Sequence, residues 1–295
     1  IGGIVGGVEM QKVTFTNAVG ETIELYRRPF FLSKVEGLGD VDANIHSINS
    51  PGLDGVVDVE VVMEPRYIPM EVDIIDDHKV NQRILSKVFN PKLGCGKLIY
   101  ENGYVKVGIS AIPEHAPKIP DTRPIVTKKA TIDMMCPSPY WEDLEYTVVN
   151  QDSTPTDGTS FPLTLPTSFP TTDYDYLVVE NNGDVETPVI LEITGPADNV
   201  IINNETTGES INVISQIRES YKLVINTDPR NRKVDYMFAG AVNKADAYDM
   251  LNIDSDFFQL AVGVNKITIY TGSGADQGLA LDRLNIKYKQ LYIGV

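Results

Sequence analysis

Cysteine is scarce in this 295-residue chain, which carries only Cys95 and Cys136. No CxxC pair occurs, so the sequence provides neither a disulfide scaffold nor a zinc framework, and it fits a reducing compartment without requiring one. Long apolar runs are missing too, since none approaches the ~18 residues that a membrane span needs. The apolar residues 1–8 are few and follow no cationic segment, so they do not resemble a signal peptide. We expect a soluble protein with no membrane insertion.

Basic residues are outnumbered by acidic ones. Lys and Arg total 25, Asp and Glu total 41, and the formal net charge is −16 with His neutral. Such a balance argues against a surface that holds nucleic-acid phosphates or anionic lipids. It is compatible with a surface that repels them.

What the sequence has in plenty is short segments rich in Val, Ile, Thr and Tyr, set between Gly, Pro, Asn and Asp. These segments predict a mainly β protein. Strict alternation of polar and apolar residues at 266–270 and 284–288 favours antiparallel sheets with one buried face. The strands that we predict are 12–16, 56–62, 104–109, 176–179, 189–193, 222–225, 266–270 and 284–288.

One segment, 77–89, has helical periodicity instead. It places four apolar residues on one face: Val80, Ile84, Leu85 and Val88. Asp76 or Asp77 can cap its start, and Asn90-Pro91 ends it. A single amphipathic helix in a β protein is expected to cover the end or open face of a barrel.

The length predicts two domains. Between residues 150 and 173 the composition turns to Thr, Ser, Pro, Gly and Asp, which is typical of an extended connector. We therefore predict one domain at 1–150 and a second at 151–295.

No motif in the sequence indicates a catalytic, cofactor-binding or metal site. His46, His78 and His115 stand in no metal-ligand spacing, and neither cysteine has a local nucleophile signature. The acidic stretches 73–77 and 40–44 are better explained as loop acids and a helix cap than as cation sites. The Gly-rich stretch 271–278 lacks the lysine of a phosphate-binding loop.

The only tryptophan is Trp141, in a segment with two prolines, Pro137 and Pro139. A sugar-stacking platform is one interpretation of it. A buried aromatic anchor at the close of the first domain is the interpretation we favour.

Several stretches, in order along most of the chain, resemble the distal tail protein family of tailed bacteriophages and related tail-like particles that attack Gram-positive bacteria. One of them is ATIDMMCPSPYW at 130–141, which looks like the close of the family's N-terminal domain. The others are 15–25, 36–39, 50–55, 66–69, 89–92, 96–100, 180–188, 193–196, 203–209 and 260–265.

The resemblance implies an N-terminal split-barrel-like β domain that carries the helix, followed by a galectin-like β-sandwich. It also implies a homo-hexameric ring at the tip or baseplate of a phage tail. Such a ring joins the tail tube protein to the tail-associated lysin or hub and serves as a platform for receptor-binding proteins. It would belong to the virion and be assembled in the cytoplasm of the host bacterium. An acidic bore suits a ring through which DNA passes without specific binding.

For the ring contacts, we consider edge strands near 12–16 and 56–62, tested by replacing Phe15 and Val59 with lysine. Two other functions remain open. The second half could be a cell-wall carbohydrate-binding module for host adsorption, although it contains no Trp and no His. The chain could also be a wall hydrolase, although no sequence motif supports this function.

Overall fold

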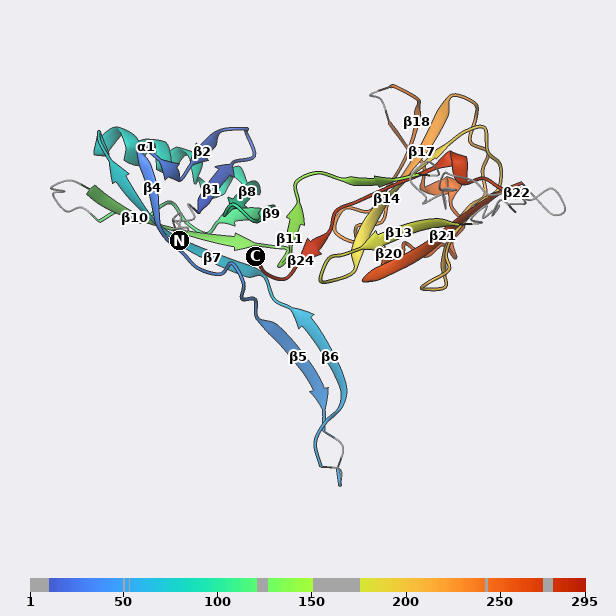
Figure 1. Ribbon diagram of the computed structural model, residues 1–295, viewed down its shortest axis with the longest axis horizontal. Coiled ribbons are helices and arrows are strands. Elements are labelled where there is room, and N and C mark those ends of the chain that lie inside the picture. The colour runs from blue at the N-terminus through green and yellow to red at the C-terminus, as the bar shows by residue number, and fades with distance from the viewer. Residues whose placement is uncertain are drawn as a thin grey trace, which may run out of the picture. The chain divides into compact units, whose positions relative to one another are not determined.

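The computed structural model (Figure 1) describes residues 11–49, 51–52, 54–120, 127–150, 176–241, 244–272 and 278–295. The chain divides into two compact units: residues 1–144 with 292–295, and residues 145–291. The first boundary thus lies at 144/145 instead of 150, and four residues near the C-terminus return to unit 1. The predicted connector lies mostly outside the described residues, at 151–175.

Unit 1 is built on a ten-stranded sheet. Eight of its strands follow the order β2-β1-β8-β9-β10-β7-β4-β3, and β11 and β24 pair beside this path. Its strands, together with the separate pair β5 and β6, are β1 (Lys12–Thr16), β2 (Thr22–Glu24), β3 (Tyr26–Arg27), β4 (Phe30–Val35), β5 (Ala43–Ile48), β6 (Val57–Met63), β7 (Arg66–Ile75), β8 (Gly96–Glu101), β9 (Lys106–Pro113), β10 (Thr127–Cys136), β11 (Trp141–Asp143) and β24 (Leu291–Tyr292).

A single residue joins the two ends of this sheet. Only Leu25 separates β2 from β3. Its N–H donates to the carbonyl of Val13 in β1 (2.8 Å), and its carbonyl accepts from the N–H of Leu32 in β4 (2.6 Å). Because the first and last strands of the path are one continuous segment, the sheet closes on itself, in agreement with the expected split-barrel-like domain.

The helix α1 (His78–Val88) is followed by the short 3-10 helix η1 (Pro91–Leu93). The expected helix is confirmed to within a residue, but its predicted buried face is wrong. Leu85 and Val88 are buried together with Asn81, whereas Val80 is 60% and Ile84 42% exposed.

The turn before the helix explains this difference in phase. The Asn81 side-chain amide donates to the carbonyls of Ile75 (3.2 Å) and Asp76 (2.8 Å), so Asn81 faces the barrel. Asp77 occupies the N-cap with φ 27° and makes no side-chain capping bond, which corrects the expected acidic cap. At the other end Phe89 stacks on Phe15 of β1, with ring centroids 4.9 Å apart.

Unit 2 is a β-sandwich. The larger sheet has the order β12-β23-β14-β17-β18-β19 with β20 on β14, and the smaller has β13-β21-β15-β16 with β22 on β21. The strands are β12 (Thr147–Val149), β13 (Leu177–Asn181), β14 (Thr187–Thr194), β15 (Val200–Asn204), β16 (Glu209–Val213), β17 (Tyr221–Asn226), β18 (Lys233–Phe238), β19 (Ala245–Asp246), β20 (Gln259–Leu260), β21 (Gly263–Thr271), β22 (Gly278–Leu279) and β23 (Leu284–Tyr288), with 3-10 helices η3 (Tyr248–Met250) and η5 (Leu281–Arg283).

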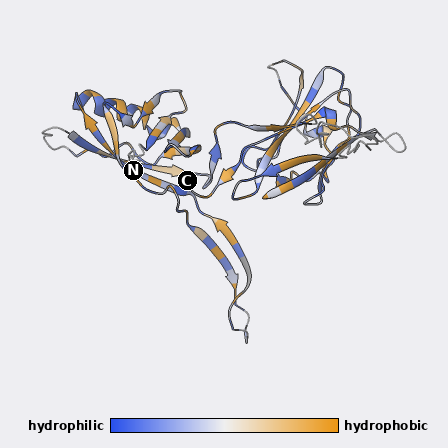
Figure 2. Ribbon diagram, in the orientation of Figure 1, coloured by the Kyte–Doolittle hydropathy of each residue, from blue (hydrophilic) through white to orange (hydrophobic). Residues whose placement is uncertain are grey.

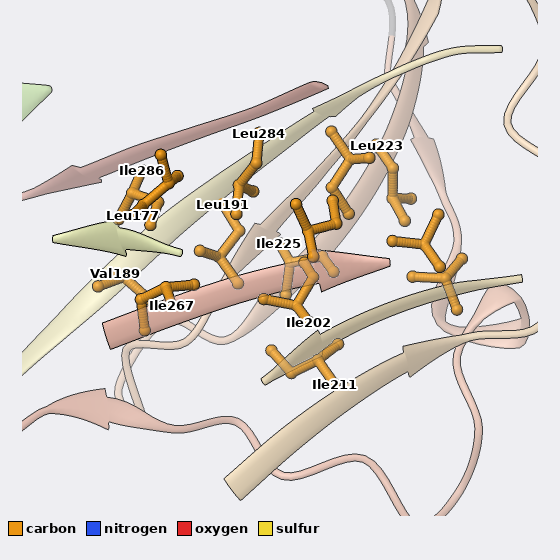
Figure 3. Packing of buried hydrophobic residues seen from close by; sticks show 14 of the residues in the cluster. Leu177, Val189, Leu191, Ile202, Ile211, Leu223, Ile225, Ile267, Leu284 and Ile286 are labelled. Carbon is orange, nitrogen blue, oxygen red and sulfur yellow. The ribbon is translucent and has the colours of Figure 1, made fainter. Parts of the chain in front are cut away.

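The two sheets of unit 2 enclose one apolar core (Figure 3). Leu191, Leu223 and Ile286 enter it from the larger sheet, and Ile202 and Ile267 from the smaller; all five are fully buried. Every strand pairing that the structure describes in this unit is antiparallel, as the alternation predicted. The inner side chains of each strand fill the core, which leaves the alternate ones on the outer face.

Candidate functional site

A two-stranded arm of unit 1 is largely left uncovered by the described residues of the chain. Strands β5 and β6 pair with each other and, in the described residues, with no other strand, and they extend away from the barrel (Figure 1). All six residues of β5 are exposed. Ile45 and Val61 are cross-strand partners, so they share one face of the arm. They are 62% and 55% exposed.

Further apolar side chains of the arm are also open to solvent. Ile48 is 60% and Val62 48% exposed, and hydrophobic residues mark both strands in Figure 2. An isolated hairpin is marginally stable in water, and four exposed apolar side chains on one hairpin favour an interaction site. The arm is therefore our candidate assembly surface.

The base of the arm is held by one buried arginine. Arg66, the first residue of β7, is 1% exposed. Its guanidinium donates to five backbone carbonyl oxygens, those of Pro139 (2.7 Å), Gly37 (2.7 Å), Leu38 (3.1 Å), Asp40 (2.9 Å) and Ile293.

The charge of Arg66 is stabilised mainly by the dipoles of backbone carbonyl groups and less by a counterion. Its five hydrogen bonds among the described residues all go to main-chain oxygens. Burial lowers the pKa of the guanidinium, and Cys136 and Asp40 oppose that effect. An arginine stays charged even so, and its planar fork suits several fixed acceptors at once. The residue therefore ties the segment before the arm to the rest of the barrel.

Trp141 and Gly37 complete this base. Trp141 is fully buried, and its indole N–H donates to the carbonyl of Leu38 (3.0 Å). Gly37 has φ +77°, and a Cβ there would stand 2.0 Å from the carbonyl oxygen of Tyr67. Only glycine combines that φ with so close an approach. The favoured interpretation of Trp141, an anchor where the domain closes, thus agrees with its burial.

The histidines that the sequence offered do not come together. His46 lies on the arm, His78 begins α1, and His115 contacts Asp133 through Nε2 (2.9 Å). Within the described part of the chain, no group of three His, Cys, Asp or Glu side chains is placed to hold a metal ion. The described residues also include no helix long and apolar enough to cross a membrane.

The two cysteines are free thiols in different surroundings. Cys95 is exposed, and Cys136, the last residue of β10, is fully buried. Burial raises the pKa of the Cys136 thiol to about 12, although Arg66 lowers it in part. A thiol that stays protonated is a poor nucleophile, so Cys136 acts as a small core residue.

The acidic stretch 40–44 makes main-chain hydrogen bonds at the base of the arm. Asp40 gives its carbonyl to Arg66, and the Asp42 carbonyl accepts from the N–H of Glu64 across the base of the arm (2.8 Å). Of the Gly-rich stretch 271–278, residues 273–277 lie outside the described residues.

One of the two proposed edge strands is not an edge. Strand β1 pairs with β2 on one side and β8 on the other, and Phe15 is fully buried. A lysine at Phe15 would disrupt the barrel core instead of an interface. The segment near 56–62 is β6 of the arm; the side chain of Val59 lies outside the described set.

Arg66 and the partner strand β5 were not identified as site elements from the sequence. A signal for Arg66 exists, because it is in phase with four buried residues of β7: Ile68, Met70, Val72 and Ile74. An arginine in an inward position of a strand needs internal acceptors. For β5 no such signal exists, since uniform exposure leaves no alternation.

Two family models match the chain. The phage tail protein RIFT-related domain matches residues 19–136, and the siphovirus-type tail component, C-terminal domain, matches residues 182–292. Together they cover most of both units. A comparison with curated protein sequences gives no match.

Solved structures similar to the chain include the Dit protein of phage SPP1, described as a paradigm of the hub adsorption apparatus in phages that infect Gram-positive bacteria. It has a TM-score of 0.63 at 14% identity over 95% of this chain and 98% of that one. The baseplate of phage P2 in its activated conformation with Ca gives 0.60 at 11% identity, over 97% and 99%. The same baseplate with Sr gives 0.57 at 12% identity, over 98% and 100%. At identities this low, the structural similarity shows that the fold is shared.

Proposed function

The chain belongs to the siphovirus-type distal tail proteins, and from this premise we propose that six copies close into a ring at the tip of the tail. It is a structural component of a phage tail or baseplate, located in the tail of the virion. In the proposal, the ring joins the tail tube protein to the tail-associated lysin or hub protein. Its outer side carries receptor-binding proteins. The role is structural and not enzymatic, and assembly takes place in the cytoplasm of the host.

The exposed arm is the observation that carries the ring. Ile45 and Val61 lie side by side on a face that the chain's own described residues leave uncovered. A neighbouring copy would cover them with a surface other than its own arm. Such a contact joins two different patches, and it closes into a ring when the rotation between copies allows. The anchored base supports this role, because a fixed arm loses little conformational freedom on binding.

The charge supports a ring through which DNA can pass. Six copies at −16 each repel a phosphate backbone. A basic bore would instead hold the genome through counterion release. We therefore propose that duplex DNA passes the lumen without specific binding.

The ring is tested with the full-length chain, by multi-angle light scattering and negative-stain images. We expect rings of six copies with an open bore. The double variant Ile45→Thr/Val61→Thr keeps β-branched residues but removes apolar surface, so it should fold and remain monomeric. A monomeric wild-type chain would contradict a ring that closes by itself.

A matched control separates the arm from general surface polarity. Val264 in unit 2 is 53% exposed, and Val264→Thr makes the same chemical change away from the arm. This control should form rings like the wild type. If the arm variant also forms rings, the contact lies elsewhere.

A further inference from the structure

A groove of about 420 Å³ lies on the outer face of the larger sheet of unit 2. No step of the proposed ring uses it. It is lined by aliphatic, amide, charged and aromatic side chains from β14, β17, β18, β19, η3 and the loops beside them: Ile190, Val224, Asn226, Asn231, Lys233, Val234, Asp235, Lys244, Asp246 and Tyr248. Its volume is in the range of small-molecule sites.

The register of the sheet arranges the floor in two rows. In one row Asn226 lies between Ile190 of β14 and Lys233 of β18. In the other, Asp235 lies between Val224 of β17 and Asp246 of β19. Cross-strand neighbours stand about 5 Å apart, so each row carries one aliphatic side chain at one end and two polar side chains beside it.

The wall of the groove is fixed in place. The hydroxyl of Tyr248 donates to the carbonyl of Arg232 (2.8 Å), and its backbone N–H donates to Oδ1 of Asp246 (3.3 Å). The phenol ring and the carboxylate therefore hold their positions without a ligand. A prearranged site loses little entropy on binding.

Two carboxylates face each other at the sheet edge. Asp235 and Asp246 are direct cross-strand partners, a like-charge pairing that disfavours the fold. Lys244 offsets part of the repulsion through its contact with Oδ2 of Asp235 (3.1 Å). Nothing in the packing of the core requires the second carboxylate, since Asp246 is exposed.

Donor groups stand beside these acceptors. Oδ1 of Asn226 accepts from the N–H of Asp228 (3.0 Å), so the NH₂ group of the same side chain can donate to a ligand. The ammonium of Lys233 takes part in none of the hydrogen bonds or salt bridges found among the described residues. Ammonium and amide groups donate, and carboxylates accept. The groove thus offers hydrogen-bond donors and acceptors beside its aliphatic side chains.

We propose that this groove binds a neutral hexose-containing glycan. Vicinal hydroxyls of a hexose both donate to carboxylates and accept from Lys233 and Asn226, and its C–H face covers Val224 and Ile190. Lys233 and Lys244 balance the two carboxylates of the lining in formal charge, so the groove has no net charge that would favour a phosphate-bearing ligand over a neutral one. A purely apolar ligand would leave those charges unsolvated. The site goes beyond the ring and does not depend on it.

The test uses the full-length chain and four named probes, D-glucose, D-galactose, N-acetyl-D-glucosamine and lactose, followed by saturation-transfer-difference NMR. We expect at least one of them to bind saturably. The isosteric double variant Asp235→Asn/Asp246→Asn should weaken that binding by at least about tenfold, because charged acceptors bind hydroxyls more strongly than amides do. Asp254→Asn, on an exposed loop outside the groove, is the matched control and should bind as the wild type does.

A thermal melt distinguishes a binding role from a structural one. Removing the facing charges should leave the melting temperature equal or higher while sugar binding is lost. A large drop in melting temperature would assign the two carboxylates to the fold and overturn the proposal. Absence of binding by all four probes would overturn it as well, as would unchanged binding by the double variant. Preferential binding of glycerol phosphate that Lys233→Met abolishes would replace the neutral glycan with an anionic ligand.

Discussion

The guanidinium of Arg66 and the indole of Trp141 donate to the same acceptor, the carbonyl oxygen of Leu38, at 3.1 and 3.0 Å. The guanidinium carbon also lies 5.9 Å from the centre of the indole ring. Two large side chains from distant strands therefore fix one main-chain atom in the segment that leads into the arm. Rigidity at this point decides how precisely the arm is presented.

Replacing Arg66 with methionine should destabilise unit 1 strongly. The variant keeps the apolar stem but leaves buried carbonyl oxygens without donors, at an expected cost of about 3 kcal/mol or more. Trp141 is the only tryptophan, so its fluorescence during urea unfolding reports on unit 1. Arg28→Met is the control, since Arg28 is exposed with a 3.8 Å contact to Asp76, and it should unfold as the wild type does.

Replacing Gly37 with alanine tests the turn itself. A methyl group would meet the Tyr67 carbonyl oxygen at 2.0 Å, in a backbone conformation that disfavours side chains. We expect a loss of about 1–3 kcal/mol in the free energy of unfolding. Gly20→Ala has a similar positive φ but open space around it, so it should cost less in the same urea titration. Equal losses would mean that strain, and not the close approach, dominates.

The helix phase is testable with two adjacent residues. Leu85 is fully buried and Ile84 is 42% exposed. Leu85→Ala should cost about 2–5 kcal/mol through lost burial and a cavity. Ile84→Ala should stay within about 0.5 kcal/mol in chemical denaturation. Similar losses in both variants would restore the buried face that the sequence pattern predicted, since that face included Ile84 as well as Leu85.

Alkaline pH should weaken unit 1 through Cys136. Its folded pKa of about 12 exceeds the ordinary value of 9.0, so the unfolded chain loses the thiol proton first. The stabilising contribution is therefore complete below about pH 9 and declines as the pH rises toward 12. Unfolding measured across this range should have a shallower pH slope in Cys136→Ala, whatever its absolute stability. The exposed Cys95→Ala should keep most of the wild-type slope.

The sequence predicted much of unit 2 and less of unit 1. Predicted strands at 189–193, 222–225 and 284–288 lie within β14, β17 and β23, because each alternates over a single core. Strands β7 and β10, which form a ten-residue ladder, were not predicted. Pro69 inside β7 lacks a ladder donor, and it is tolerated there although the strand has partners on both sides.

The assembly surface was only half predicted. The segment 56–62 was recognised through its valines and corresponds to β6, but its partner β5 was missed. The alternation of polar and apolar residues reflects burial within one chain, and the described side chains of the arm are almost all exposed. The return of Ile293 to Arg66, 227 residues away, lies beyond any local pattern.

Because Ile293 follows unit 2 in the chain, the base of the arm is completed late in synthesis. The ribosome makes residues 145–291 before it makes the segment at 292–295 that belongs to unit 1. Until then Arg66 lacks the carbonyl of Ile293, and the base of the arm is incomplete. A nascent chain that has not reached residue 293 thus holds this segment through four acceptors of Arg66 instead of five, so the synthesis of residues 292–295 decides when the arm stands on its complete base.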